Sequence, residues 1–174
     1  MASDASWALE KQFDRIIAEH SRAIWRLACS YEPVAGRREE LMQDIALALW
    51  QALPHFRGEC SERTFVFRIA HNRGLSHIWK RKPAHESIDK LPERDHPIDE
   101  RPEPEEQAAQ ECRRVALMSA VRSLPVTYRQ MILLMLEDLS HAEMAEIVGI
   151  TERNVAVRLN RARKALKEAL EGQS

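Results

Sequence analysis

The chain has 174 residues, of which 44% are hydrophobic and 30% are charged, and its formal net charge is −1. This composition suits a globular protein with a packed core, and no run of residues reaches the roughly 20 apolar positions of a membrane span. The three cysteines are widely spaced without a metal-binding pair, and the N-terminus lacks a signal-peptide pattern. We therefore expect a cytoplasmic protein with reduced thiols, no membrane insertion, no metal and no cofactor.

Charge is unevenly distributed along the chain. Residues 83–111 hold 3 cations and 10 carboxylates, a net charge of −7, whereas the segments before and after them each carry +3. Residues 83–106 are also rich in proline and have no helical or strand periodicity. This pattern predicts a flexible acidic linker at 83–106 between two small folded domains, at 7–82 and 107–170.

Three helices are predicted in the N-terminal domain from the spacing of apolar residues. Pro33 and Gly36 are predicted to separate the first helix from the second, and Pro54 to end the second. Ser61 is a suitable N-cap for the third. The predicted helices are 7–30, 38–53 and 62–81.

The second predicted helix has apolar residues on two faces. Its core arc is Leu41, Met42, Ile45, Leu49, Ala52 and Leu53. Gln43, Leu47 and Trp50 cluster on the opposite side, where a pair of helices alone would leave them exposed. Either another part of the domain covers this cluster, or it docks on a partner.

The third predicted helix combines aromatic and basic residues. Its expected buried arc is Phe65, Val66, Ile69 and Ala70, and its expected outward face is Arg68, His71, Asn72 and Leu75. Together with Phe56 and Arg57 in the preceding loop, this mixture favours binding of single-stranded nucleic acid, because bases stack on rings while cations follow the phosphates. Cations that stabilise a helix C-terminus would explain residues 80–82, but not Phe56, Arg57 and Asn72.

The C-terminal domain is predicted to end in a helix-turn-helix. Ser140 and Glu143 form a capping box at the start of a short helix, which stops at Gly149. Thr151 then caps a longer helix that runs to Leu170. The preceding predicted helices are 107–124 and 125–136, and the second of these is apolar all round from Met131 to Leu136, so we expect it to be central.

The final helix separates its residues by face. The stripe that we expect to be buried is Val155, Leu159, Ala162, Leu166 and Leu170. The opposite face carries Arg153, Val157, Asn160, Arg161 and Lys164, flanked by Arg158 and Arg163. In a helix-turn-helix this outer face enters the major groove, where Arg and Asn bind base edges and Lys mostly binds phosphate. A basic face on an isolated helix is usually only solvated, but the turn and the caps favour DNA binding.

No strand pattern is present, so we predict an all-α protein of two small helical domains. An enzyme is not expected. The sequence has no glycine-rich phosphate loop and no Ser/His/Asp constellation, and its seven histidines are scattered.

Two blocks of the sequence resemble the extracytoplasmic-function (ECF) subfamily of bacterial sigma factors. The first, Phe13 to Lys82, contains ELMQDIALALW at 40–50, FRG at 56–58 and TFVFRIAHN at 64–72, and is similar to region 2 of that family. The second, Leu117 to Leu170, contains LPVTYRQMILL and the helix-turn-helix, and is similar to region 4. Both blocks in this order, across an acidic linker, make the resemblance specific.

The resemblance implies a factor that binds core RNA polymerase and directs transcription initiation at specific promoters. It implies docking on the polymerase, at the β′ coiled coil and the β subunit, by Leu41, Met42, Gln43, Asp44, Leu47 and Trp50. It implies capture of the melted −10 strand by Phe56, Arg57, Thr64, Phe65, Arg68, Asn72, Lys80 and Arg81. It implies recognition of the duplex −35 element by Thr151, Arg153, Asn154, Val157, Arg158, Asn160, Arg161, Arg163 and Lys164.

The resemblance further implies that the acidic linker threads near the RNA exit path, that an anti-sigma factor is a partner, and that the free protein is a monomer. The chain departs from the family pattern at three places. Arg37-Arg38-Glu39-Glu40 stands where the family usually has an acidic, alanine-containing quartet. Phe65 replaces a commoner Trp, and Ser76 a commoner Asp.

A stand-alone helix-turn-helix regulator is the alternative function. Such regulators usually dimerise to place two recognition helices on two half-sites. The helix around Leu47 and Trp50 argues against this alternative, because a regulator does not need a polymerase-docking surface.

Overall fold

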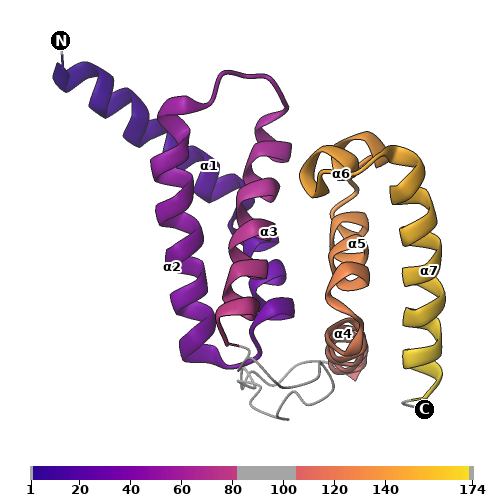
Figure 1. The fold of residues 1–174 in the computed structure, drawn as a ribbon. Helices are drawn as coiled ribbons and strands as arrows, with labels where there is room; N and C mark the ends of the chain where they lie inside the picture. The colour runs from indigo at the N-terminus through magenta and orange to yellow at the C-terminus, as the bar shows by residue number, and fades with distance from the viewer. Residues whose placement is uncertain (1, 82–104, 173–174) are drawn as a thin grey trace. The chain divides into compact units, whose positions relative to one another are not determined.

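The computed structural model describes residues 2–81 and 105–172, and every regular element in these two stretches is a helix (Figure 1). The predicted all-α fold is confirmed. The helices are α1 (Ala2–Tyr31), α2 (Ala35–Ala52), α3 (Glu62–Arg81), α4 (Glu105–Ser123), α5 (Val126–Leu136), α6 (His141–Val148) and α7 (Glu152–Glu171), with a short 3-10 helix η1 at Leu53–His55. None of them combines the length and the apolar character needed to cross a bilayer. The predicted linker lies outside the described residues, except for its last two positions.

The chain divides into two compact units, one containing α1, α2 and α3 and the other containing α4, α5 and α7. In the first unit each of the three helices packs against the other two. In the second unit α5 packs along α7, and α4 packs against both. Each unit therefore has its own core.

The joint between α1 and α2 is shorter than predicted. Pro33 ends α1, because a proline disfavours the helical conformation of the residue before it. The prediction that Gly36 also interrupts the helices is wrong, since Gly36 lies in the first turn of α2. The carboxylate of Glu32 takes the place of a side-chain cap for α2. Its Oε1 accepts a hydrogen bond from the backbone N of Val34 at 3.0 Å, and its Oε2 lies 2.9 Å from Nε2 of His77 on α3.

The core of the first unit follows the apolar stripes of its helices. Its fully buried side chains include Ile16, Ile24, Leu41, Ile45, Leu49, Val66 and Phe67. The prediction that His71 faces outward is wrong, because this imidazole is 0% exposed. Its Nδ1 is hydrogen-bonded to the hydroxyl of Tyr31 at 2.8 Å, and its Nε2 has no partner among the described residues. The ring of Tyr31 lies directly against Gly74, so α1 and α3 approach closely at this point.

The core of the second unit is centred on α5, as predicted. Pro125 occupies the N-cap position of α5, one residue before its predicted place. Residues 131–134 are buried, whereas Leu136 at the end of the helix is 45% exposed. α7 buries Val155, Leu159 and Ala162. Leu166 and Leu170, expected on the same buried stripe, are only half-buried.

Gly74→Ala should lower the free energy of unfolding. Alanine normally stabilises a helix interior by about 1 kcal/mol relative to glycine. Here, however, the added methyl would overlap the ring of Tyr31, which is itself buried and hydrogen-bonded to His71. Overpacking of this kind costs roughly 1–3 kcal/mol, so we expect a net loss in urea unfolding followed by circular dichroism. Gly36→Ala is the matched control, because no atom lies within 4 Å of its added methyl, and this variant should be as stable as the parent or slightly more so.

Burial lowers the pKa of His71 to about 3. An unfolded histidine titrates near pH 6.5, so between about pH 6.5 and 3 the unfolded chain binds a proton that the folded chain excludes. This group therefore stabilises the fold fully above pH 6.5, and its contribution declines by about 1.4 kcal/mol per pH unit as the pH falls. Urea titrations from pH 7 to pH 4 should show a shallower decline for His71→Gln than for the parent. Asn72→Gln provides the control, since it changes an exposed residue of the same helix that does not titrate and should leave the slope unchanged.

Candidate nucleic-acid interface

The helix-turn-helix has the caps that its sequence predicts. Oε2 of Glu143 accepts from the backbone N of Ser140 at 2.8 Å, and Oγ of Ser140 accepts from the backbone N of Glu143 at 3.2 Å, which completes the capping box. Gly149 has φ +73°, a conformation that favours glycine, and ends α6. Oγ1 of Thr151 then accepts from the backbone N of Asn154 at 3.3 Å and begins α7. Local hydrogen bonds therefore fix both ends of the turn that presents α7.

The outer face of α7 is exposed and basic. Over its length α7 carries six cations and three carboxylates. Exposed side chains on and beside this face are Thr151, Arg153, Asn154, Val157, Asn160, Arg161, Arg163 and Lys164, and Arg158 is half-buried. A face of this composition can contact both base edges and phosphates in a major groove.

Two of these cations have partners within the unit. Nζ of Lys164 lies 3.9 Å from Oε1 of Glu168, but the two side chains are 81% and 64% exposed, so water and salt weaken this pair. Lys164 can therefore exchange Glu168 for a phosphate at little cost. Arg163 is different, because its Nε donates to Sδ of Met135 at 3.2 Å. This contact turns Arg163 toward α5 and away from the middle of the outer face.

The loop before α3 places an aromatic ring at the surface of the first unit. The half-buried ring of Phe56 packs on Phe65, with centroids 4.5 Å apart. The resemblance assigned Thr64 and Phe65 to DNA contact, but they are only 1% and 6% exposed. Oγ1 of Thr64 is instead hydrogen-bonded to Oγ of Ser61 at 2.8 Å. These two residues therefore support Phe56 and the start of α3 rather than form the surface themselves.

A surface pocket opens beside this ring. It is lined by His55, Phe56, Arg57, Glu59, Cys60, Phe65 and Arg68. Farther along α3, Asn72 and Lys80 are exposed, as expected, and the side chain of Arg81 lies outside the described residues. Sequence reasoning missed Glu59 as a surface group of this region. Trp79, which the sequence places among the aromatic and basic residues at the end of α3, is 64% exposed.

One part of the second apolar face of α2 is covered by another helix of the same unit, and the other part is exposed. Trp50 is half-buried, because Phe13 of α1 packs edge-on against it with centroids 5.3 Å apart. Leu47, in contrast, is 55% exposed, and Gln43 and Asp44 are exposed beside it. Met42 is half-buried. Leu41, to which the resemblance assigned a docking role, is fully buried and belongs to the core.

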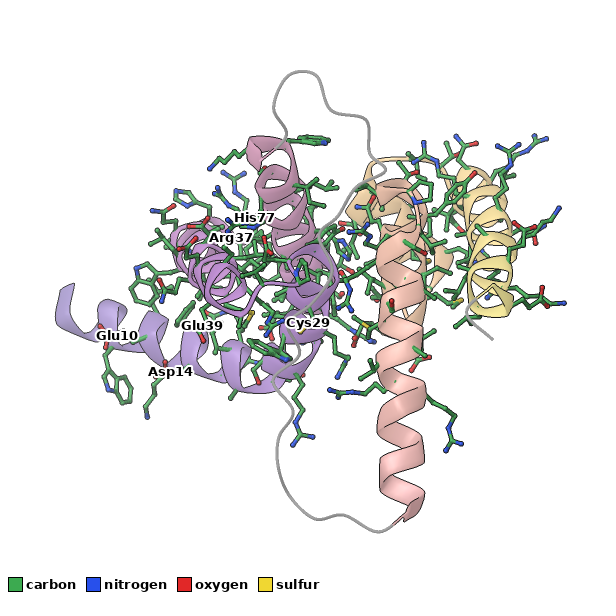
Figure 2. All side chains as sticks on the ribbon, turned by 90° about the horizontal axis from the view of Figure 1, so that it is seen from below. Glu10, Asp14, Cys29, Arg37, Glu39 and His77 are labelled. Atoms are coloured by element: carbon green, nitrogen blue, oxygen red, sulfur yellow. The ribbon has the colours of Figure 1, made fainter. Side chains whose placement is uncertain are left out.

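The two arginines that depart from the family pattern have different environments. Arg37 is exposed on α2, as is Glu39 (Figure 2). Arg38 is only 6% exposed, and its guanidinium lies 4.6 Å from the centroid of the Trp25 ring. Its Nη1 also donates to the backbone O of Pro33 at 3.3 Å. Only Arg37 therefore adds a positive charge to the surface before Leu41.

The two halves of the chain match known families. Residues 16–83 match the family described as Sigma-70 region 2, and residues 114–166 match the family described as Sigma-70, region 4. The RNA polymerase sigma factor CnrH of Cupriavidus metallidurans is 24% identical over 181 residues, covering 100% of this chain and 94% of that protein. The ECF RNA polymerase sigma-E factor of Escherichia coli K12 is 27% identical over 164 residues, covering 90% of this chain and 85% of that protein.

Solved structures show the same fold. CnrH in complex with the cytosolic domain of CnrY matches with a TM-score of 0.70 at 24% identity, covering 99% of this chain and 96% of that one. The sigma factor RpoE of Bartonella quintana, in a complex with the anti-sigma factor NepR, matches with a TM-score of 0.67 at 22% identity. This match covers 92% of this chain and 98% of that one.

A stand-alone regulator would account for the region 4 match but not for the region 2 match. The two matches, in order along one chain, define a sigma-70-type protein. The chain belongs to the ECF group of RNA polymerase sigma factors, and it directs promoter-specific transcription initiation.

Proposed function

We propose that three surfaces of this chain divide the work of initiation, one for core polymerase and two for promoter DNA. The observation that supports this division most strongly is that an exposed apolar residue, Leu47, and a basic recognition helix, α7, occur in one chain on separate compact units. A protein with one of these surfaces could bind either the polymerase or the DNA. A protein with both can connect them.

The polymerase-docking surface consists of Gln43, Asp44 and Leu47 on α2. An exposed leucine between polar side chains suits a coiled-coil partner, because the leucine fills an apolar gap while the polar groups bond at the rim. We assign this surface to the β′ coiled coil, with the β subunit as a further contact of the chain. Met42 and Trp50 contribute at its half-buried edges, and Leu41 supports it from the core.

The single-stranded −10 DNA contacts the loop before α3 and the exposed face of that helix. Phe56 supplies a ring for stacking, and Arg57, Arg68 and Lys80 supply cations for the phosphates. Asn72 supplies an amide for a base edge. Thr64 and Phe65 act indirectly by holding Phe56, and Arg81 extends the basic end of the helix.

The duplex −35 DNA is read by α7. Arg153 and Asn154 lie in the first turn, the part of a recognition helix that approaches base edges, and Val157 one turn later suits a thymine methyl group. Arg161 and Lys164 lie farther along and anchor phosphates. Thr151, Arg158, Asn160 and Arg163 complete the surface at its start and flanks.

An anti-sigma factor is the proposed inhibitory partner. One structural relative, RpoE of Bartonella quintana, was solved with the anti-sigma factor NepR, and another, CnrH, was solved with the cytosolic domain of CnrY. A protein that covers Leu47 would prevent docking on the polymerase. The free chain is proposed to be a monomer.

Leu47→Glu combined with Gln43→Ala should weaken the affinity for core polymerase by at least tenfold, because a carboxylate replaces an apolar contact of about 1.5–3 kcal/mol. Affinity is measured by pull-down or by fluorescence anisotropy with labelled protein. The circular-dichroism spectrum should be unchanged, since both residues are exposed.

Val34→Glu is the matched control for this experiment. It places the same charge on another exposed apolar residue of the same unit, which is 40% exposed, and should leave polymerase affinity unchanged. Equal affinity of the double variant and the parent would remove the Leu47 face from the interface.

Arg153→Ala should reduce holoenzyme binding to the preferred −35 sequence by about 1–3 kcal/mol and flatten discrimination among −35 variants. Lys164→Ala should weaken binding to every sequence nearly equally and lower the salt dependence by about one unit of slope. The measurement is promoter binding by the holoenzyme over a panel of −35 mutants at several salt concentrations. If Lys164→Ala changed the preferred sequence while Arg153→Ala changed only overall affinity, the assignment of the two ends of α7 would be reversed.

A further inference from the structure

Three possible metal ligands meet on the first unit, and none of them is among the residues assigned to polymerase or DNA. Glu19 and His20 come from α1, and Glu62 comes from the first turn of α3. One ligand atom from each of these side chains lies within 4.8 Å of the others. We propose that Glu19, His20 and Glu62 bind one divalent transition-metal ion, with Zn²⁺ as the representative ion. This inference does not depend on the proposed polymerase and promoter contacts.

His20 is the observation that points to a ligand. The side chain is only 8% exposed, and it makes no hydrogen bond or ion pair with any described residue. Its ring contacts Phe67 edge-on, with centroids 6.4 Å apart, which fixes one side of the imidazole. The burial of this side chain holds its imidazole in place beside the two carboxylates. A metal ion between this ring and the two carboxylates would supply the partner that the imidazole lacks among the described residues.

Arg15 shows that the carboxylates already attract a cation. Its Nη1 donates to Oε1 of Glu62 at 2.9 Å, and its Nη2 donates to Oε2 at 2.5 Å. The same Nη1 lies 3.4 Å from Oε2 of Glu19. The side chain of Arg15 is 55% exposed on a long stem, so it can withdraw into solvent. The guanidinium and a metal ion would therefore compete for the same pair of carboxylates.

The ligand set indicates the class of metal. One imidazole with two carboxylates matches the nitrogen and oxygen ligands of Zn²⁺, whose bonds are about 2.0–2.2 Å long, and leaves a position for water. Small side-chain rotations would bring the three ligand atoms to this distance from a shared ion. Mg²⁺ is disfavoured, because it requires oxygen ligands throughout. A bound ion would join the middle of α1 to the start of α3, so it should stabilise the three-helix unit.

The test uses the full chain and zinc chloride, with isothermal titration for affinity and thermal unfolding for stabilisation. The parent should bind one equivalent of Zn²⁺ and unfold at a higher temperature with it. Glu19→Gln should weaken binding on the order of tenfold or more. Arg15→Ala should tighten binding, because it removes the competing cation. If the two carboxylates served only to pair with Arg15, Glu19→Gln would not weaken Zn²⁺ binding and Arg15→Ala would not tighten it.

The controls separate this site from adventitious zinc binding by other histidines and cysteines. Glu10→Gln changes an exposed carboxylate of the same helix and should leave affinity unchanged (Figure 2). His20→Asn should abolish binding, and the exposed Glu19 keeps the test available if this core variant fails to fold. Magnesium chloride should have no effect. Absence of binding to the parent and to Arg15→Ala, or equal affinity of parent, Glu19→Gln and Arg15→Ala, would overturn the proposal.

Discussion

The contact of Tyr31 with Gly74 sets how closely α1 and α3 approach, and the first unit is built around that distance. The ring lies where any larger residue at Gly74 would place its side chain, and the hydroxyl is hydrogen-bonded to the buried His71. α2 packs against both of these helices, so its orientation follows from theirs. The relative positions of the exposed Leu47 on α2 and of the residues of α3 that we propose to contact DNA therefore depend on this one contact.

A second constraint is that each helix of the first unit must bury one side against its neighbours and expose another side to the solvent. α3 shows this most clearly, because Val66 and Phe67 are buried while Asn72 and Trp79 are exposed. The buried residues next to the loop that we propose to bind DNA have a supporting role. The ring of Phe65 packs against that of Phe56, so a substitution at Phe65 would act on the proposed DNA contact through the position of Phe56.

Much of this fold was predictable because its signals are local. The ends of α6 and α7 depend on Ser140, Glu143, Gly149 and Thr151, each of which acts within a few residues of its own position. The same holds for Ser61 at the start of α3, whose Oγ accepts from the backbone N of Thr64 at 3.0 Å. Periodicity identified most of the buried positions for the same reason, although Leu166 and Leu170 of α7 are only half-buried.

The errors arose where a distant neighbour decides the outcome. Helical spacing places His71 opposite the core arc, but Tyr31, 40 residues earlier, encloses it and supplies its hydrogen bond. Spacing likewise leaves Trp50 on the same face as Leu47, and only the position of Phe13 distinguishes them. Arg38 could not be assigned from sequence, because its burial depends on the ring of Trp25. The cluster around His20 was missed because its third member, Glu62, comes from another helix.

The carboxylates near the C-terminus of α7 affect how the protein searches for its target. The carboxylate of Glu168 lies 3.9 Å from the ammonium group of Lys164. The carboxylate of Glu171 lies 3.7 Å from the ammonium group of Lys167. Binding to arbitrary DNA depends almost entirely on cations that displace counterions, and each carboxylate on the helix lowers its net positive charge. A chromosome offers an immense excess of non-target sites, so a more basic helix would leave most copies bound to them. By lowering the net positive charge of α7, Glu168 and Glu171 should leave more of the protein in solution, where it can encounter polymerase.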